Sequence, residues 1–124
     1  MYLLYTNRVI DFCNYKLPYN ANNLLSSIEP AISVITRIEL FASSKITHKE
    51  KLSLEEFIQI ATVYDTINTH IITKTIAIRQ EYKTKLPDAI IAATALVYDF
   101  TLITRNNSDY KNIQGLNVID PWVI

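Results

Sequence analysis

The stretch Leu86-Pro87-Asp88-Ala89-Ile90-Ile91-Ala92-Ala93-Thr94-Ala95 is an apolar run opened by a proline–aspartate pair. Proline suits the first turn of a helix because its φ is already helical, and aspartate favours the positive end of the helix dipole. A second run, residues 101–104, follows closely and is short and rich in β-branched side chains. Together the two segments predict a buried helix followed by a strand, which is the repeating unit of an α/β sheet.

Short apolar runs alternate with longer segments of helical period along the rest of the chain. The expected strands are residues 2–4, 31–35, 69–72, 101–104 and 117–119. The expected helices are about residues 8–14, 24–28, 36–44, 54–64 and 73–83, and the helix that starts at Pro87. Strands separated by helices favour βαβ crossovers. We therefore predict an α/β fold with a central, mainly parallel sheet of four or five strands and helices on both faces.

The composition is that of a globular domain, which we expect to span residues 1–124. Hydrophobic residues make up 49% of the chain, enough for a real core at this length. Twelve basic and twelve acidic side chains cancel, so a polyanion must be held by local charge or through a bound metal. A single glycine excludes phosphate-binding loops built on repeated glycines.

The cellular setting follows from a few further features. The single cysteine, Cys13, excludes an internal disulfide and is typical of a reducing compartment. No apolar run reaches the roughly 18 residues of a membrane span. The first residues lack the long apolar core of a signal peptide, because Asn7, Arg8 and Asp11 interrupt them. We therefore expect a soluble, cytoplasmic protein with no membrane partner.

Acidic side chains lie beside several of the apolar runs. Glu39 comes soon after the run 32–36, Asp88 opens the helix described above, and Asp109 follows the run 101–104. The run 2–4 ends instead at Tyr5, where this pattern predicts a carboxylate. The carboxyl ends of parallel strands face one crevice, and carboxylates gathered there suit a hard divalent cation. The pattern therefore predicts a site for metal-assisted phosphodiester chemistry in which one ligand is missing.

Each acid also has a purely local interpretation. Thr36 and Glu39 have the spacing of a capping box, in which the threonine caps a helix and the glutamate returns to the cap. Asp88 is also explained by a helix start, and Asp109 lies in a polar segment where aspartate commonly forms turns. Taken one at a time, these motifs leave both interpretations open.

The joint pattern resembles the PIN-domain family. Four motifs occur in the family's order, and the third of them is the most specific. They are Tyr2-Leu3-Leu4-Tyr5-Thr6-Asn7, Ile32-Ser33-Val34-Ile35-Thr36-Arg37-Ile38-Glu39-Leu40, Leu86 to Ala95, and Leu102-Ile103-Thr104-Arg105-Asn106 with Asp109-Tyr110, Gly115-Leu116 and Asp120-Pro121-Trp122. The resemblance covers the whole chain and is strongest to the VapC-type toxins of bacterial toxin–antitoxin pairs.

The resemblance implies a PIN-like three-layer α/β/α domain with Mg²⁺- or Mn²⁺-dependent endoribonuclease activity. It also implies a VapB-type antitoxin as partner, RNA as substrate and a homodimer. The residues at the family's functional positions are Glu39, Asp88, Asp109 and Asn106 as catalytic residues, Asp88 and Glu39 as metal ligands, and Thr6, Asn7 and Thr104 as supporting residues. Arg37 and Arg105 lie near the same strand ends and are candidates for contact with the RNA backbone.

Two positions depart from the family pattern. Tyr5 stands where the family has its first aspartate, a principal metal ligand, and Arg8 stands where a hydrophobic residue is common. A phenol with a pKa of about 10 is neutral at pH 7 and is a poor ligand for Mg²⁺. We therefore expect the family fold with strongly weakened metal binding and impaired cleavage.

Two other functions fit the sequence. A catalytically inactive PIN module would serve as a binding partner, with a groove for an antitoxin helix formed by apolar residues of the early helices. These residues are Ile10, Phe12, Leu24, Leu25 and Ile28, and ordinary core packing is the other interpretation of them. A receiver-like regulatory domain also fits the alternation of strands and helices, but the contexts of Pro87-Asp88 and Asp120-Pro121-Trp122 argue against it.

Overall fold

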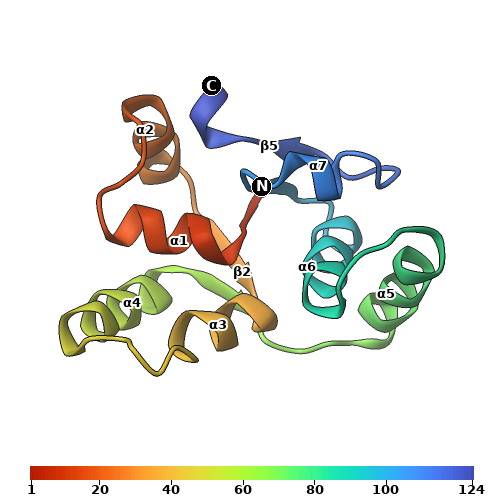
Figure 1. The fold of residues 1–124 in the computed structure, drawn as a ribbon, viewed down its shortest axis with the longest axis horizontal. Helices are drawn as coiled ribbons and strands as arrows, with labels where there is room; N and C mark the ends of the chain where they lie inside the picture. Colours follow the sequence, from red (N-terminus) through yellow and green to blue (C-terminus); the bar gives the residue numbers. More distant parts are fainter.

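Five parallel strands form a single sheet in the computed structural model, which describes residues 1–124 (Figure 1). The strands are β1 (Tyr2–Leu4), β2 (Pro30–Ser33), β3 (Thr62–Tyr64), β4 (Thr101–Ile103) and β5 (Val118–Ile119). Their order across the sheet is β3-β2-β1-β4-β5, and all four neighbouring pairs are parallel. The order reverses between β1 and β4, and ligands of open α/β sheets bind outside the carboxyl ends of the strands at such a point.

Helices cover both faces of this sheet. They are α1 (Thr6–Cys13), α2 (Tyr19–Ser27), α3 (Val34–Phe41), α4 (His48–Ile60), α5 (Thr69–Glu81), α6 (Leu86–Val97) and α7 (Asn107–Tyr110), followed by a 3₁₀ turn, η1 (Pro121–Val123). In Figure 1 the helices α1 to α4 lie on one side of the strands, and α5 and α6 lie on the other. The predicted three-layer α/β/α architecture with a parallel sheet is therefore confirmed.

Two apolar cores lie between the layers, and neighbouring strand residues face opposite cores. Leu3 and Leu102 belong to the core under α5 and α6, whereas Leu4 and Ile103 belong to the core under α1, α3 and α4. This alternation is the period of two that a strand imposes on its side chains. Helix α6 is buried along almost its whole length, which explains why its sequence is nearly continuously apolar.

The prediction of a strand over residues 69–72 is wrong, because these residues form the first turn of α5. The side chain of Asn68 caps the helix by accepting from the backbone N–H of Ile71 at 2.9 Å. Ile71, Thr75 and Ile78 are buried at helical spacing, so packing of this face outweighs the β propensity of the Thr and Ile side chains. The third strand is instead Thr62–Tyr64, within the residues expected to end the preceding helix.

Several helix boundaries also differ from the prediction. Strand β2 ends at Ser33 rather than residue 35, and α3 begins at Val34. Helix α4 begins at His48 rather than near residue 54, because Thr47 and Glu50 form the capping box that holds its start. Helix α2 is longer than expected, and α7 and η1 were not predicted. The predicted strands at residues 2–4, 101–104 and 117–119 and the helix that carries Pro87 are confirmed, with ends within a residue or so.

None of these helices has the length and apolar character needed to cross a lipid bilayer.

Candidate functional site

The residues predicted from the motifs meet outside the carboxyl ends of β1, β2 and β4. Tyr5 and Thr6 follow β1 directly, and Thr104 follows β4. Glu39 lies in α3, the helix that follows β2, and Asp88 lies in the first turn of α6. Tyr5 connects the ends of β1 and β4, because its backbone N–H donates to the carbonyl of Ile103 at 3.0 Å.

Tyr5 follows β1 at the position where the sequence pattern predicted a carboxylate, and it contacts Asp88 directly. Its hydroxyl donates to Oδ1 of Asp88 at 3.2 Å. Burial raises the pKa of Tyr5 to about 12, and the nearby charge of Asp88 acts in the same direction. The phenol is therefore a neutral hydrogen-bond donor at physiological pH. It lies against one oxygen of Asp88, which was predicted to be a metal ligand.

Tyr110 is a second tyrosine at this site, and its role was not predicted from the sequence. Its ring packs edge-on against that of Tyr5, with 6.1 Å between the ring centroids. The side chain is fully buried, and its hydroxyl has no hydrogen-bond partner in the structure. Burial raises its pKa, and the charge of Asp88 adds to this shift. The only sign in the sequence that Tyr110 belongs to this site is its position directly after Asp109.

Glu39 points into the crevice rather than back to the start of its own helix. Oγ1 of Thr6 donates to Oε1 of Glu39 at 2.5 Å, and the same hydroxyl is hydrogen-bonded to Oγ1 of Thr36 at 3.2 Å. The cap of α3 is Ser33, whose Oγ accepts from the backbone N–H of Thr36. The capping-box interpretation of Glu39 is therefore wrong, because the helix cap lies three residues earlier than that motif requires. Thr6 is the supporting residue that holds this glutamate.

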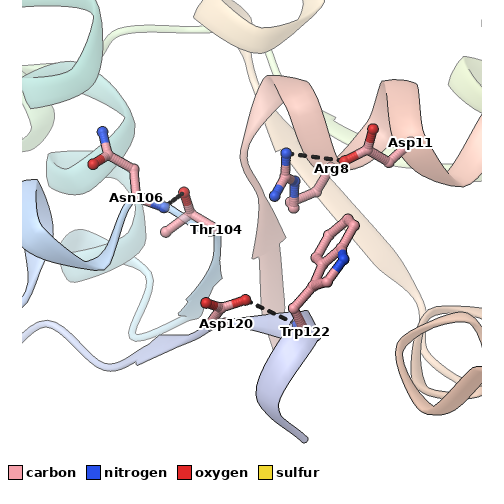
Figure 2. A network of polar contacts seen from close by, with 6 residues as sticks. All are labelled: Arg8, Asp11, Thr104, Asn106, Asp120 and Trp122. Carbon is pink, nitrogen blue, oxygen red and sulfur yellow. Dashed lines mark hydrogen bonds and ion pairs between the residues drawn. The ribbon is translucent and has the colours of Figure 1, made fainter. Parts of the chain in front are cut away.

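Asp109 lies in the short helix α7 and is held by Asn106. The side-chain amide of Asn106 donates to Oδ2 of Asp109 at 2.7 Å. The backbone N–H of Asn106 donates to Oγ1 of Thr104 at 3.0 Å, which fixes the turn after β4 (Figure 2). Asn7 is exposed at the start of α1, near the same turn.

The residues at this site do not fit a divalent cation as they stand. The structure contains no group of three or more His, Cys, Asp or Glu side chains able to hold a metal ion. The grouping of Glu39, Asp88 and Asp109 around one ion therefore stays a prediction. Each of the three carboxylates accepts a hydrogen bond from a neighbour instead, namely Thr6, Tyr5 and Asn106. Neutral donors of the chain take the place of the positive charge that such a cluster needs.

The two arginines predicted to contact RNA lie in different surroundings. Arg37 is exposed and lies 3.7 Å from Asp65, a surface ion pair that leaves it free to move. The guanidinium of Arg105 lies over the ring of Trp122, 4.3 Å from its centroid. Arg8, the other unusual residue of the sequence, lies over the same ring at 5.0 Å and pairs with Asp11 at 2.9 Å (Figure 2).

Comparison with protein-family models matches residues 6–116 to the PIN domain. The match begins directly after Tyr5. No curated protein matches the chain in a search of such proteins.

Solved structures give matches along almost the whole chain. A chain of a toxin–antitoxin complex from Klebsiella pneumoniae is 36% identical, with a TM-score of 0.80 and full coverage of both chains. A chain of VapBC2 from Rickettsia felis, bound to a DNA fragment from their promoter, is 26% identical with a TM-score of 0.80, covering 95% of this chain and 96% of that one. A chain of DNA-bound VapBC from Salmonella typhimurium is 25% identical with a TM-score of 0.80, covering 97% of each. The chain therefore belongs to the PIN-domain family and resembles its VapC-type toxins.

Proposed function

We propose that this chain is a VapC-like toxin of the Mg²⁺- or Mn²⁺-dependent endoribonuclease type, whose cleavage of RNA is impaired by Tyr5. PIN domains are generally nucleases and generally use divalent metals. The observation that supports the impairment is the contact between the Tyr5 hydroxyl and Oδ1 of Asp88. The phenol occupies the place of an acidic ligand and uses the oxygen that an ion would need.

The proposed impairment by Tyr5 has an electrostatic cause. Several carboxylates close together repel each other, and a bound cation relieves this repulsion. In this chain one carboxylate is replaced, and the remaining ones are stabilised by hydrogen bonds from hydroxyl and amide groups. Because Tyr5 stays neutral up to a pH near its pKa of about 12, no physiological change in pH supplies the missing negative charge. We therefore propose that metal affinity, rather than the fold, is what the chain lacks.

The roles of the other site residues follow from their positions. Asp88 and Glu39 are the proposed metal ligands of an active form, and Asp109 and Asn106 are proposed to complete the catalytic set from α7 and the turn before it. Thr6 holds Glu39, and Thr104 holds the turn that carries Asn106. Asn7 is proposed to support the site from the start of α1. Arg37 and Arg105 are proposed to contact the RNA backbone.

The substitution Tyr5→Asp tests this function. It returns a carboxylate beside Asp88, so the variant is expected to cleave RNA in the presence of Mn²⁺ or Mg²⁺ and to arrest growth when expressed. The unaltered chain is expected to show little or no cleavage under the same conditions. The measurement is RNA cleavage by purified protein with added metal and with EDTA.

Two controls make the result specific. Tyr5→Phe removes the hydroxyl without adding a charge, so it is expected to stay inactive. Asp88→Asn combined with Tyr5→Asp is expected to abolish the restored activity, which excludes a contaminating nuclease. A correctly folded Tyr5→Asp variant that binds Mn²⁺ but leaves RNA intact would falsify the assignment to the ribonuclease toxins.

The second candidate is a catalytically inactive PIN module that binds an antitoxin. A pocket of about 280 Å³ between α1, α3 and α4 supports it, and its apolar lining comes from Ile10, Cys13, Leu40, Ile46 and Leu54. Of the groove residues predicted from the sequence, only Ile10 lines this pocket. Leu25 is buried in the core, and Phe12 and Ile28 pack against that core. Core packing is thus the better interpretation of those three.

A VapB-type antitoxin and a homodimer are the proposed partners, because the matched structures include VapBC complexes. The product of a neighbouring gene, coexpressed with this chain, is expected to copurify with it in a complex whose mass indicates two copies of the toxin. RNA left intact by both the unaltered chain and Tyr5→Asp, together with such a complex, would favour the inactive module.

A further inference from the structure

A polar pocket of about 230 Å³ lies where the chain leaves β1 and β4, at the point where the strand order of the sheet reverses. We call it the arginine pocket, and its lining residues are Tyr5, Asn7, Arg8, Thr104, Arg105 and Asn106. Its volume is several times the ~30 Å³ that one water molecule occupies in the liquid. The lining contains two cationic side chains and no acid, in a chain whose charges otherwise balance.

Arg8 is an incompletely paired cation in this pocket. The residue is 8% exposed, and its only ion pair joins Nη2 to Oδ2 of Asp11 at 2.9 Å. Nε and Nη1 are buried without any hydrogen-bond partner. A guanidinium has five N–H donors, and leaving buried donors of a charged group unpaired is strongly unfavourable. In Figure 2 the nitrogens not paired with Asp11 face the side on which Thr104 and Asn106 lie.

Arg105 brings a second guanidinium to the same place. Both arginines lie over the ring of Trp122, at 5.0 Å for Arg8 and 4.3 Å for Arg105, and both line the arginine pocket. Burial lowers the pKa of Arg8, and the charge of Arg105 adds to this effect, whereas Asp11 and Asp120 oppose it. Oδ1 of Asp120 accepts from the backbone N–H of Trp122. The two cations therefore line one pocket, and Asp11 is the only acid that forms an ion pair with either of them.

The neutral lining residues add further donors. Oγ1 of Thr104 accepts the backbone N–H of Asn106, which leaves the threonine's own hydroxyl proton free to be donated. The Tyr5 hydroxyl is already used by Asp88, so it does not compete for a ligand here. The pocket thus combines two guanidinium groups with a hydroxyl, an arrangement that matches several acceptor oxygens on one tetrahedral anion.

We propose that the arginine pocket binds a phosphate group of an RNA strand without a metal ion, with Arg8 and Arg105 as its ligands. A phosphate is favoured over a carboxylate because it has more acceptor oxygens, and the pocket has more donors than two oxygens can satisfy. The inference rests on the proposed function only for RNA as the ligand class, and it is independent of cleavage. It also provides a function for Arg8, a buried cation with two unpaired nitrogens.

Trp122 makes the proposal directly measurable, because it is the only tryptophan of the chain and both arginines lie on its ring. The experiment titrates the full chain in EDTA with inorganic phosphate, a nucleoside 5′-monophosphate or a short single-stranded RNA. Tryptophan fluorescence is followed, with NaCl of equal ionic strength as the reference. We expect a saturable change for all three ligands, with the RNA binding tightest.

Variants assign the signal to the pocket. Arg8→Leu and Arg105→Gln are each expected to weaken phosphate and RNA binding about tenfold or more, because each removes charge-assisted hydrogen bonds. Arg79→Gln is the matched control, since Arg79 is an exposed arginine on α5 that does not line the pocket, and it is expected to bind as the unaltered chain does. Arg105 is exposed, so Arg105→Gln is expected to fold. It tests phosphate binding in the pocket even if Arg8→Leu does not fold.

Four results would overturn the proposal. They are a fluorescence change no larger than NaCl produces, unchanged binding by Arg105→Gln, binding of phosphate without binding of RNA, and tighter binding of an acidic peptide than of RNA. The last would indicate a protein carboxylate as the ligand. Failure of the proposed function is distinguishable, because an inactive Tyr5→Asp variant with intact RNA binding in EDTA counts against the nuclease and not against the pocket.

Discussion

The two edges of the crevice satisfy their charged groups in opposite ways. At the carboxylate edge, formed by Tyr5, Thr6, Glu39 and Asp88, each acid accepts a hydrogen bond from a hydroxyl of the chain. In the arginine pocket, only a few residues away along β1 and β4, Arg8 has two buried nitrogens with no partner. The two acids of the carboxylate edge are thus satisfied internally, whereas the arginine pocket is left with unused donors.

This difference shows how a PIN fold can hold two acids at this edge beside a tyrosine. The neutral phenol of Tyr5 makes the carboxylate edge stable without a cation, because a hydrogen bond replaces the charge. A neutral Tyr5 also adds no negative charge beside Arg8, so Asp11 and Asp120 are the acids whose charges act on that guanidinium. We therefore expect this crevice to favour an anion over a cation.

The largest effect is expected from metal on the Tyr5→Asp variant. Without metal, the new carboxylate repels Asp88 and the hydrogen bond at 3.2 Å is lost, so the variant is expected to be less stable than the unaltered chain. Mn²⁺ at about a hundred times its dissociation constant is expected to restore about 2.7 kcal/mol. Thermal unfolding with and without Mn²⁺ measures this. Equal stabilisation of the unaltered chain would show that Tyr5 does not block metal binding.

A smaller effect is expected when the ion pair in the arginine pocket is broken from either side. Asp11→Asn leaves the buried guanidinium of Arg8 without its partner, and a loss of about 2 to 3 kcal/mol is expected, less than for a fully buried pair. Arg8→Leu removes the unpaired donors together with the charge, so a change within about 1 kcal/mol is expected. Urea unfolding compares the two. A greater loss for Arg8→Leu than for Asp11→Asn would mean that Arg8 serves packing rather than a ligand.

The hydrogen bond that holds Glu39 is expected to contribute less. Thr6→Val keeps the shape of the side chain and removes the hydroxyl that donates to Glu39, so a loss of about 1 to 2 kcal/mol is expected. Thr75→Val is a matched control, because Thr75 is buried and its hydroxyl bonds only to the carbonyl of Ile71 in its own helix. Urea unfolding of both variants separates the two contributions. An equal effect of the two substitutions would mean that the Thr6–Glu39 contact does not stabilise the carboxylate edge.

The smallest effect is expected at alkaline pH. Because the pKa of Tyr5 is raised to about 12 in the folded chain, the unfolded chain loses this proton first as the pH rises above about 10. The contribution is therefore complete below pH 10, and the free energy of unfolding falls as the pH rises from there toward 12. Tyr5→Phe is expected to make this fall shallower, whereas Tyr15→Phe, at an exposed tyrosine, is expected to leave it unchanged. Urea unfolding at several pH values tests the difference.

Much of the fold was predictable from local patterns. The strands near residues 2–4 and 101–104 and the helix that begins near Pro87 lie in the best buried part of the molecule, where a continuous apolar sequence and a helix-start signal agree. The segment at residues 69–72 was wrongly predicted because its Thr and Ile side chains favour a strand when taken alone. Packing of one face of α5 against α6 decided in favour of a helix.

The candidate site was predictable in its members but not in its contacts. The positions of Tyr5, Glu39 and Asp88 after strands and at helix starts indicated that they face one crevice, and the hydrogen bonds to Tyr5 and Thr6 agree with this. Glu39 turns away from the start of its own helix because Ser33 caps that helix. The motif had suggested Thr36 as the cap. The buried hydroxyl of Tyr110 had no signal of its own in the sequence.

The sequence by itself determined the alternation of strands and helices, the family motifs and the presence of Tyr5 directly after the first strand, because these depend on residue type and spacing along the chain. Only the tertiary structure decided that Tyr5 donates to Asp88, that Thr6 holds Glu39, and that Arg8 and Arg105 share the ring of Trp122. Except for Arg105 and Trp122, which are 17 positions apart, those contacts join residues 33 or more positions apart, and in the case of Arg8 and Trp122 they join the two ends of the chain. Distance in space, which sets the strength of hydrogen bonds and charges, is fixed by packing of the sheet and its helices.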